Sequence, residues 1–513
     1  MGNICNWFRS VARFISIISY WKLRLPNVDG SFTLRGFFMT NVSRADFSSG
    51  RVFEQADHLQ KSSGLQQQSP SANDAVHGDS TLRADDPHSR ATFHKPAWSL
   101  TDMAHQIDRR GRRLKDSNGD GITQLSYTFN EVAANESKFN ETQKAQARRS
   151  MQSWADVANV TFEEDAVGAE GRLRFINDKT PAVADAVFSH YQGRVRINPR
   201  YGDNRAPAVN GFGRQTLTHE IGHTLGAAHT GEYDAMRGPV TYHKHAAYAQ
   251  DSRAFSLMSY FDVSHTHQDF KGQHASSPLM ADIAWSHKVF GANRQTRNTD
   301  TTYGFNSNTL RDDLSLSSPR DGAVFCVWDG GGNDTLDFSG YHQNQVINLR
   351  AESFSDVGGM KGNVSIARGV VLENAIGGSG NDVLIGNAAD NRLKGGVGAD
   401  RMRGGAGSDS FVYDSAGDST LYAPDQVMDF VSGQDKIDIS ALLRKHDIRS
   451  LTFVSQFTGR AGEVGVGYDP HTNESWVVLD LTGNGEIDLY LESHGQIRHA
   501  DIVGDVPVSY HYA

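Results

Sequence analysis

The chain has 513 residues, which is more than one hydrophobic core usually supports, so we expect two or three domains. Its formal net charge is −10 without a basic stripe, and its only cysteines are Cys5 and Cys326. This composition excludes nucleic acid as an expected partner, and it excludes a disulfide framework or a thiolate zinc site. No stretch approaches the roughly 20 apolar residues that cross a bilayer, so we expect no stable membrane insertion.

Residues 1–71 are expected to be an N-terminal extension or propeptide that is largely disordered. Residues from about 43 to 87 are rich in Ser, Gln and Asp, and this composition buries too little apolar surface to fold alone. The apolar run at residues 14–21 is short and lacks a small-residue cleavage site, so it is not typical of a secretory signal peptide. Three alternatives stay open here: a membrane-surface helix, an extension of no fixed role, and a true start at Met39.

Regular structure is first predicted after about residue 98. An apolar stripe with helical spacing predicts a helix over residues 143–158, and short apolar runs predict strands at residues 173–176 and 186–188. A further helix is predicted over residues 279–289 and ends near Gly291. Together these elements predict a mixed unit of helices and strands.

Between these elements, residues 219–229 read HEIGHTLGAAH. Residues four apart share one face of a helix, so His219 and His223 can bind one metal ion. Glu220 is then placed to reach a water on that metal, and Gly226 can end the helix with a left-handed turn that brings in His229. Three imidazoles with one open position are typical of a catalytic zinc site. The alternative is a helix whose histidines are solvated or belong to a core.

The segment after this motif, residues 256–260, reads SLMSY. The extended histidine motif followed by a turn that carries Met is the signature of the metzincin proteases. Met258 would form an apolar floor under the imidazoles, and Tyr260 could point its phenol at the zinc as a removable ligand. We expect Thr216 or Thr218 to cap the start of the zinc helix.

Beyond about residue 320 the chain consists of short apolar segments separated by Gly, Asn and Asp. Four consecutive nine-residue units begin at Gly377, Gly386, Gly395 and Gly404. They match the calcium-binding nonapeptide repeat, in which each repeat forms one half-turn of a parallel β-helix or β-roll. The alternative, a flexible Gly-rich linker, does not explain why apolar residues recur in phase with Asp.

Three of these units supply a carboxylate and, two positions later, an apolar side chain. The carboxylates belong to Asp382, Asp400 and Asp409. Such oxygens are the hard ligands that Ca²⁺ prefers, usually six or more of them. The apolar side chains, expected to point into the roll, are those of Leu384, Met402 and Phe411. The second unit has Asn391 in place of Asp, so we expect one calcium site to be poor or empty.

With these motifs the chain resembles the serralysins, a family of secreted bacterial metzincins that carry calcium-binding repeats. The resemblance covers roughly residues 72–505. Besides the zinc motif it rests on six strings, at residues 152–162, 255–260, 303–307, 356–359, 362–367 and 433–438. It implies an α+β zincin-type (metzincin) catalytic domain at residues 72–310. An all-β parallel β-roll (RTX) domain with the C-terminal secretion region would follow at residues 311–513.

The resemblance also implies the metal ligands. One catalytic zinc would be held by His219, His223, His229 and Tyr260, with Glu220 as general base and Tyr260 as a further catalytic residue. Several structural calcium ions are implied. A first calcium group would comprise Arg297, Thr299, Thr301, Asp329, Gly331, Gly332, Asp334 and Glu373. The sites of the roll would comprise Gly378, Gly380, Asp382, Gly395, Gly396, Val397, Gly398, Ala399, Asp400, Gly405, Ala406 and Asp409. A last pair after the roll would be Asp418 and Asp425.

Members of this family are made with a propeptide, leave the cell through a type I secretion apparatus without a cleaved signal peptide, and fold as they meet external calcium. The resemblance therefore implies a secreted, extracellular monomer. Its implied partners are protein or peptide substrates, the type I secretion apparatus and a proteinaceous inhibitor. Because cysteine is unusual in the family, we expect Cys326 to be a buried free thiol.

These observations predict a zinc-dependent endopeptidase of broad specificity that hydrolyses peptide bonds with zinc-activated water and a Glu general base. The strand at residues 186–188 is expected to form the sheet edge on which an extended peptide pairs. Two alternatives stay open. One is a non-catalytic calcium-dependent adhesin or binding protein with RTX repeats, and the other is a protease delivered to a host as an effector.

Overall fold

The computed structural model describes residues 95–111, 114, 116–189, 191–233 and 238–511. The predicted extension at residues 1–71 lies outside them. The described chain divides into two compact units, one that ends at Ala375 and one that begins at Ile376. The predicted domain limit between residues 310 and 311 stays a prediction.

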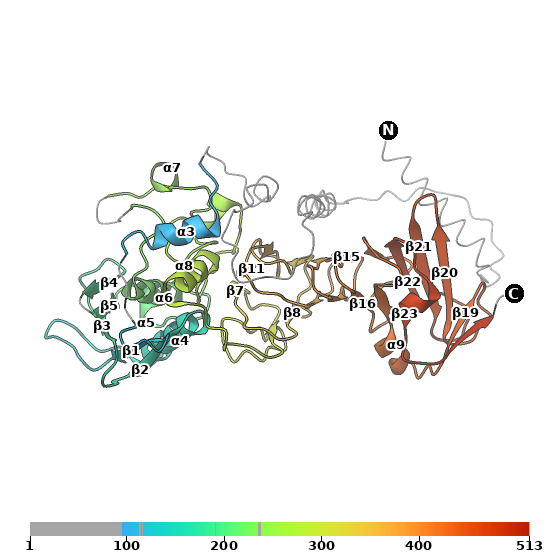
Figure 1. Cartoon of the computed structure of the whole chain (residues 1–513), viewed down its shortest axis with the longest axis horizontal. Coiled ribbons are helices and arrows are strands. Elements are labelled where there is room, and N and C mark those ends of the chain that lie inside the picture. The colour runs from blue at the N-terminus through green and yellow to red at the C-terminus, as the bar shows by residue number, and fades with distance from the viewer. Residues whose placement is uncertain (1–94, 112–113, 115, 190, 234–237, 512–513) are drawn as a thin grey trace. The chain divides into compact units, whose positions relative to one another are not determined.

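The first unit contains the longer helices, a five-stranded sheet and a series of short strands (Figure 1). Its helices are α3 (Leu100–Ile107), α4 (Glu141–Val157), α5 (Gly202–Arg205), α6 (Phe212–Leu225), α7 (Tyr242–His245), the 3-10 helix η4 (Val263–Thr266) and α8 (Met280–Phe290). Its longer strands are β1 (Thr123–Thr128), β2 (Val160–Glu164), β3 (Gly171–Asn177), β4 (Ala184–Ser189) and β5 (Gln192–Ile197). The short strands are β6 (Thr302–Gly304), β7 (Phe325–Val327), β8 (Thr335–Asp337), β9 (Val346–Asn348), β10 (Phe354–Ser355), β11 (Val364–Ile366) and, at the end of the unit, β12 (Asn374–Ile376).

The elements predicted in this unit are confirmed. The helix predicted over residues 143–158 is α4, the predicted strands lie within β3 and β4, and the later predicted helix is α8. Asn140 caps α4, because its side chain accepts from the N–H of Gln143 while the Gln143 side chain accepts from the N–H of Asn140. On the apolar stripe of this helix, Met151 and Trp154 are fully buried.

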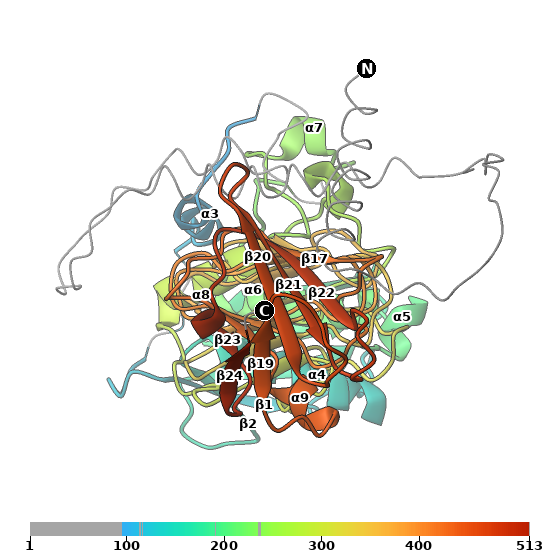
Figure 2. The ribbon, with the colours of Figure 1, turned by 90° about the vertical axis from the view of Figure 1, so that its right-hand side faces the viewer.

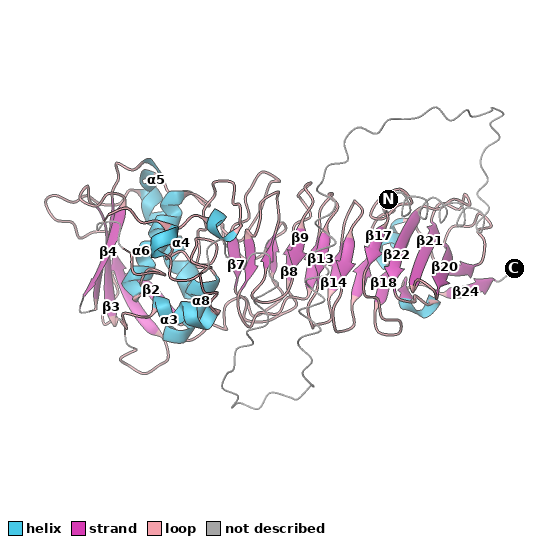
Figure 3. Cartoon of the chain, turned by 90° about the horizontal axis from the view of Figure 1, so that it is seen from above, coloured by secondary structure: helices cyan, strands magenta, loops and turns pink. Residues whose placement is uncertain are grey.

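The long strands form one sheet in the order β2-β1-β3-β5-β4. Its pairs are parallel except for β4, which runs antiparallel to β5 at the edge. Figure 3 shows α4, α6 and α8 gathered on one face of this sheet. Gly193 on β5 permits the close approach of α6, because a Cβ there would lie 2.6 Å from Leu173 Cδ2 and 3.2 Å from Thr224 Cβ.

The second unit consists mainly of strands. They are β13 (Val383–Ile385), β14 (Arg392–Lys394), β15 (Arg401–Arg403), β16 (Ser410–Val412), β17 (Asp425–Val427), β18 (Lys436–Asp438), β19 (Leu451–Val454), β20 (Glu463–Asp469), β21 (Glu474–Asp480), β22 (Leu489–His494), β23 (Ile502–Val503) and β24 (Val508–His511). The helix α9 (Ser440–Lys445) and the 3-10 helix η5 (His499–Asp501) interrupt them. Figure 2 shows β20, β21 and β22 side by side, and these three strands pair antiparallel.

The nine-residue units place their strands alternately in two sheets. β13 pairs in parallel with β15 in one sheet, and β14 pairs in parallel with β16 in the other. The apolar side chains predicted to point inward, those of Leu384, Met402 and Phe411, are fully buried. The predicted parallel β-roll, with one half-turn per repeat, is therefore confirmed.

The described residues also bear on membrane-spanning helices and on the thiol of Cys326. No helix among them has the length and apolar character needed to span a bilayer. Cys326 is a buried free thiol, as predicted, and burial raises its pKa to about 12. A thiol with a pKa this high stays protonated and unreactive at neutral pH.

The variant Gly213→Ala tests the packing at the start of α6. An added Cβ would lie 2.2 Å from the carbonyl oxygen of Asp203, so the backbone between α5 and α6 would have to move. Overpacking of this kind costs about 1–3 kcal/mol, so we expect a lower midpoint of thermal unfolding. Gly202→Ala is the matched control, since no heavy atom lies within 4 Å of its added Cβ. Equal midpoints for the two variants would contradict the close contact.

Candidate active site

The predicted zinc motif lies on the second half of α6 and on the turn that follows it. The helix ends at Leu225, and Gly226 adopts a left-handed φ of 109°. The N–H of Gly226 donates to the carbonyl oxygen of His223 at 3.1 Å, and the N–H of Ala227 donates to that of Gly222 at 3.0 Å. This is the geometry of a glycine C-cap, so the predicted turn at Gly226 is confirmed.

The start of α6 differs from the prediction. The helix begins at Phe212, so Thr216 and Thr218 lie inside it and do not cap it. Their hydroxyls donate to the carbonyl oxygens of Phe212 and Arg214, at 2.8 and 3.1 Å. The expectation that one of them caps the helix is therefore wrong. Tertiary packing explains the earlier start, because Arg214 is fully buried and the first turn is held by its neighbours rather than by a side-chain cap.

The turn after α6 brings His229 back beside His219 and His223. One ring nitrogen from each residue lies within 4.8 Å of the other two, so among the described residues these three side chains form a group that could hold a metal ion. The rings of His219 and His223 are nearly perpendicular, with centroids 4.6 Å apart. The three imidazoles thus converge on one small volume.

Backbone carbonyls orient all three imidazoles through Nδ1. The Nδ1 atoms of His219, His223 and His229 lie 2.7, 2.7 and 3.2 Å from the carbonyl oxygens of Leu257, Ala227 and Tyr233. Because a carbonyl can only accept, each Nδ1 carries the proton and each Nε2 presents a lone pair. The Nε2 atoms of His223 and His229 are only 3.0 Å apart, where two lone pairs repel unless a cation lies between them. This donor set fits Zn²⁺.

Burial keeps these imidazoles neutral. It lowers the pKa of His223 to about 4 and that of His229 to about 3, and it lowers the pKa of His219 well below its usual value. A protonated imidazole cannot bind a metal ion, because its second nitrogen then has no lone pair. The three side chains are therefore in the form that binds zinc at neutral pH.

Glu220 lies beside the histidines with only 7% of its surface exposed. Its Oε2 is buried and has no hydrogen-bond partner among the described residues. Burial, together with the charge of Asp185 on β4, raises the pKa of this carboxyl to about 8. A buried carboxylate without a partner is costly, so the site is suited to accept a hydrogen bond or a proton.

The turn at residues 256–260, called the Met-turn after Met258, lies against the same helix. The ring of Tyr260 has its centroid 4.3 Å from that of His229 and 6.1 Å from that of His219. Met258 is fully buried, and its Sδ would lie 3.0 Å from a Cβ built on Gly222 of α6. The structure thus brings together the five residues predicted for the zinc site, which are His219, Glu220, His223, His229 and Tyr260.

The sequence of this chain is similar to the sequences of several known proteins. Residues 292–504 match the family model described as Peptidase M10 serralysin C terminal. Metallopeptidase AprA from Pseudomonas marginalis is 49% identical over 441 residues, covering 80% of this chain and 92% of the relative. Metalloprotease AprA from Pseudomonas entomophila is 50% identical over 442 residues, covering 80% and 91%. Serralysin B from Dickeya chrysanthemi is 50% identical over 387 residues, covering 71% and 80%. The chain belongs to the serralysin family.

As a serralysin, the chain is a metalloendopeptidase. The predicted fold class, an α+β catalytic domain followed by a parallel β-roll, is confirmed. A solved structure of a subunit of the mannuronan C5-epimerase from Azotobacter vinelandii covers 32% of this chain and 91% of its own, with 22% identity. Its TM-score of 0.23 is too low to bear on the fold.

The first group of residues predicted to bind calcium in this serralysin gathers around Asp334. Its Oδ1 accepts from the N–H of Thr301 at 2.8 Å, and its own N–H donates to Glu373 Oε2 at 2.7 Å. Oδ2 is buried and has no hydrogen-bond partner in the described part of the chain. Burial, with the charges of Asp329 and Glu373, raises the pKa of Asp334 to about 8. Carboxyl groups that repel one another in this way fit a calcium ion.

The other members of this group lie on two backbone turns that touch. Arg297 has a left-handed φ of 47°. A Cβ on Gly332 would lie 2.5 Å from the carbonyl carbon of Thr299, so only glycine permits this approach. The N–H of Gly331 donates to Asp329 Oδ1 at 2.6 Å. The turns therefore bring carbonyl oxygens and carboxylates to one place.

Stacked turns of the roll hold the next group. A Cβ on Gly396 would lie 2.2 Å from the carbonyl oxygen of Gly378, and one on Gly398 would lie 2.2 Å from that of Gly380. These turns also carry Asp382, Gly395, Val397, Ala399 and Asp400, and the next turn carries Gly405, Ala406 and Asp409. The N–H of Asp382 donates to Asp400 Oδ1 at 2.7 Å, while Asp400 Oδ2 is buried without a partner among the described residues. Burial raises the pKa of Asp400 to about 8, and the charge of Asp382 adds to this effect.

The last pair of predicted residues lies beside the stacked turns. Asp425 Oδ1 accepts from the N–H of Asp400 at 2.8 Å. Asp418 accepts from the N–H of Asp414 at 2.8 Å, and its charge adds to the burial that raises the pKa of Asp400 and of Asp425. Sequence reasoning missed Asp435, whose Oδ1 accepts from the N–H of Asp409 at 3.0 Å. Asp435 lies outside the nine-residue spacing, but it belongs to the string at residues 433–438 and is followed two positions later by the apolar Ile437, as in the repeats, which was the available signal.

Sequence reasoning also missed Asp282, which supports the Met-turn. Its Oδ1 accepts from the hydroxyl of Ser256, and its Oδ2 accepts from the N–H of Leu257 at 2.8 Å and of Leu279 at 2.9 Å. The carbonyl of Leu257 is the partner of His219 Nδ1. Asp282 thereby fixes the group that orients the first histidine.

Arg109 is the corresponding missed support for the third histidine. Its guanidinium donates to the carbonyl oxygens of His229 and of Gly231, the latter at 2.7 Å. Arg109 lies in the turn after α3, far from the zinc motif in sequence. No pattern in the residues around it distinguishes it from the other arginines of the chain. The ring of Tyr233 stacks on His229 with centroids 5.7 Å apart.

The variant Asp282→Asn tests the support of the Met-turn. A neutral amide has one acceptor oxygen where the carboxylate has two, so one of its three donors loses its partner. A hydrogen bond to a charged group contributes about 1.5–3 kcal/mol, and we expect a lower midpoint of thermal unfolding together with a lower kcat/KM on casein. Asp203→Asn is the control, because Asp203 is exposed on α5. A midpoint and kcat/KM as high as those of the control would contradict the role of Asp282.

Proposed function

We propose that this zinc metalloprotease holds its zinc with His219, His223 and His229, that Tyr260 is a fourth protein ligand, and that Glu220 is the general base. The observation that carries the proposal is the convergence of three neutral imidazoles, with ligand nitrogens within 4.8 Å of one another, beside a buried carboxylate. When bound there, zinc supplies Lewis acidity, which lowers the pKa of a water ligand and polarises the scissile carbonyl.

Glu220 performs the proton transfers in this proposal. Its Oε2 accepts the proton from the attacking water and later delivers it to the nitrogen of the leaving amine. Two properties of the side chain support this role. Its Oε2 has no competing partner among the described residues, and the side chain is buried beside the histidines.

Tyr260 stabilises the charge that develops on the substrate. Its ring lies beside His229, at 4.3 Å between centroids, so its phenol belongs to the same small volume as the histidines. We propose that the phenol, which could also be a metal ligand, would donate a hydrogen bond to the oxygen of the attacked carbonyl. A donor aimed at a developing oxyanion acts strongly in a buried site.

The substrate is a protein, and we propose that it lies along the outer edge of β4. This strand ends the sheet and pairs on its other side with β5. Val187 on β4 is 46% exposed, and Asp185 on the same strand lies close enough to raise the pKa of Glu220. An extended peptide that pairs through main-chain hydrogen bonds places few demands on its side chains, so broad specificity is expected.

The remaining parts of the proposal concern stability and location. The calcium residues of the first group and of the roll would bind several calcium ions that stabilise the protein, which the buried Oδ2 atoms of Asp334 and Asp400 support. We also propose, from membership of the serralysin family, export through a type I secretion apparatus, action outside the cell, and regulation by a proteinaceous inhibitor.

Removal of the metal tests the zinc site. A strong zinc chelator should abolish cleavage of casein, and added zinc should restore it. His223→Ala should bind less than one zinc ion per chain, because two imidazoles remain, while His243→Ala, a change at an exposed residue of α7, should keep one. Zinc content is measured by atomic absorption. Proteolysis that survives the chelator would refute the zinc mechanism.

The variant Glu220→Ala tests the general base separately from metal binding. It should retain one zinc ion per chain and lose about 100- to 10,000-fold in kcat/KM on casein, which is the usual contribution of general acid–base catalysis. Glu232→Ala is the control, because Glu232 is an exposed carboxylate near the third histidine. Full activity of Glu220→Ala would rule out this residue as the base.

A further inference from the structure

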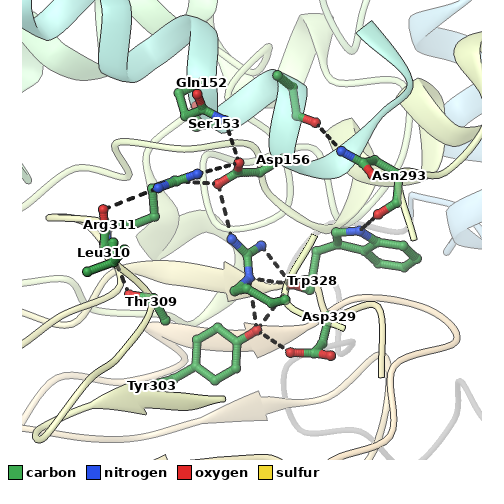
Figure 4. Close-up of polar contacts among 12 residues, drawn as sticks. Gln152, Ser153, Asp156, Asn293, Tyr303, Thr309, Leu310, Arg311, Trp328 and Asp329 are labelled. Atoms are coloured by element: carbon green, nitrogen blue, oxygen red, sulfur yellow. Dashed lines mark hydrogen bonds and ion pairs between the residues drawn. The ribbon is translucent and has the colours of Figure 1, made fainter. Parts of the chain in front are cut away.

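One carboxylate at the end of α4 collects four donors (Figure 4). Asp156 Oδ2 accepts from Arg297 Nη1 at 3.0 Å and from Arg311 Nε at 2.7 Å. Its Oδ1 accepts from Arg311 Nη2 at 2.9 Å and from Gln152 Nε2 at 2.8 Å. Burial alone would raise the pKa of Asp156, but Arg311 and Arg297 hold it below the usual value. Asp156 is therefore an ionised, buried and fully paired group.

Arg297 continues from this carboxylate toward the first calcium group. Its Nη2 donates to the carbonyl oxygen of Trp328 at 2.7 Å, and its Nε donates to the hydroxyl of Tyr303 at 3.0 Å. Tyr303 is fully buried, and its hydroxyl donates to Asp329 Oδ2 at 2.7 Å (Figure 4). One guanidinium and one phenol thus connect Asp156 with a carboxylate proposed to bind calcium.

Contacts of α4 also reach α6, the helix that carries the first two histidines of the zinc motif. Trp154, two residues before Asp156, donates from Nε1 to the carbonyl oxygen of Thr218 at 3.0 Å. The hydroxyl oxygen of Thr218 lies 2.8 Å from Ser150 Oγ and can accept its hydrogen. Thr218 directly precedes His219, and the Trp154 ring would lie 3.0 Å from a Cβ on Gly222. The last turn of α4 is therefore in contact with the segment of α6 that carries the first two histidines.

We propose that Asp156 is a positioning residue that couples calcium binding at Asp329 and its neighbours to the placement of the zinc histidines. The inference rests on the proposed calcium and zinc sites. With calcium bound, the oxygens of Asp329 stay in place, so Tyr303 and Arg297 keep their partners and hold the end of α4. Without calcium, the carboxyls of Asp329 and Asp334 repel each other, and the support of Asp156 weakens.

Coupling of this kind is reciprocal. If bound calcium raises the affinity for zinc by some factor, then bound zinc must raise the affinity for calcium by the same factor. A residue that only stabilised the fold would change the rate of zinc loss by a similar factor with and without calcium. A coupling residue changes the ratio between these two rates.

The experiment measures the rate at which zinc passes from the full-length enzyme to a zinc-selective chelator, with and without calcium. In the wild type, calcium should slow this loss by a factor within the usual range of coupling between sites, about 5- to 150-fold. In Asp156→Asn the calcium effect should fall to less than about threefold, and the calcium concentration at half-effect in a titration of tryptophan fluorescence should rise.

Two further variants keep the test decisive. Tyr303→Phe removes only the hydroxyl between Arg297 and Asp329, so it should reduce the calcium effect even if Asp156→Asn does not fold. Glu164→Gln is the matched control, because it removes another ion pair of α4, the 2.8 Å contact with Arg148, that does not lead to the calcium group. This control should retain the full calcium effect.

The possible outcomes distinguish a failure of the proposed calcium sites from a failure of the proposed coupling. If the wild type binds no calcium and loses zinc at one rate throughout, the proposed calcium sites fail, and the coupling fails with them. If the wild type is protected by calcium and Asp156→Asn and Tyr303→Phe keep that protection in full, the calcium sites stand and the coupling through Asp156 is overturned.

Discussion

The structure of the candidate active site depends on bringing together nitrogen lone pairs that repel one another. The Nε2 atoms of His223 and His229 are 3.0 Å apart, although both rings are neutral and buried. Such an arrangement is unfavourable by itself, so other contacts must impose it. The backbone carbonyls at each Nδ1, the glycine turn after α6 and the Met-turn supply these contacts. A cation then removes the repulsion that the fold has built in.

The residues proposed to bind calcium also bring together groups that repel one another, here carboxylate oxygens instead of imidazole nitrogens. Burial and the charges of Asp329 and Glu373 raise the pKa of Asp334, and burial and the charge of Asp382 raise that of Asp400 in the roll. Backbone turns that only glycine permits hold these groups together. The protein thus holds groups that repel one another at several places, and a cation of suitable charge and ligand preference would relieve each of them.

Sequence reasoning predicted the features whose determinants lie close together along the chain. The zinc motif occupies eleven consecutive residues, and each repeat defines its own strand and turn within nine, so periodicity alone predicted the roll. The contacts of Arg109 with His229 and of Asp156 with Arg311 join residues more than a hundred positions apart, and no local pattern marks them. The start of α6 was predicted wrongly for a related reason. Thr216 and Thr218 have the chemistry of helix caps, but packing of the first turn determines where the helix begins.

Because successive repeats alternate between two sheets, it matters whether an odd or an even number of repeats is added or lost. Leu384 pairs with Met402 in one sheet and Leu393 with Phe411 in the other, so each strand stacks on the strand two repeats before it. Loss or gain of one repeat would move every later strand to the opposite sheet and turn all the following loops to the other side of the roll. A change by two repeats would leave those assignments intact. Rolls of this kind are therefore expected to grow and shrink by pairs of repeats, during evolution as well as in engineered proteins.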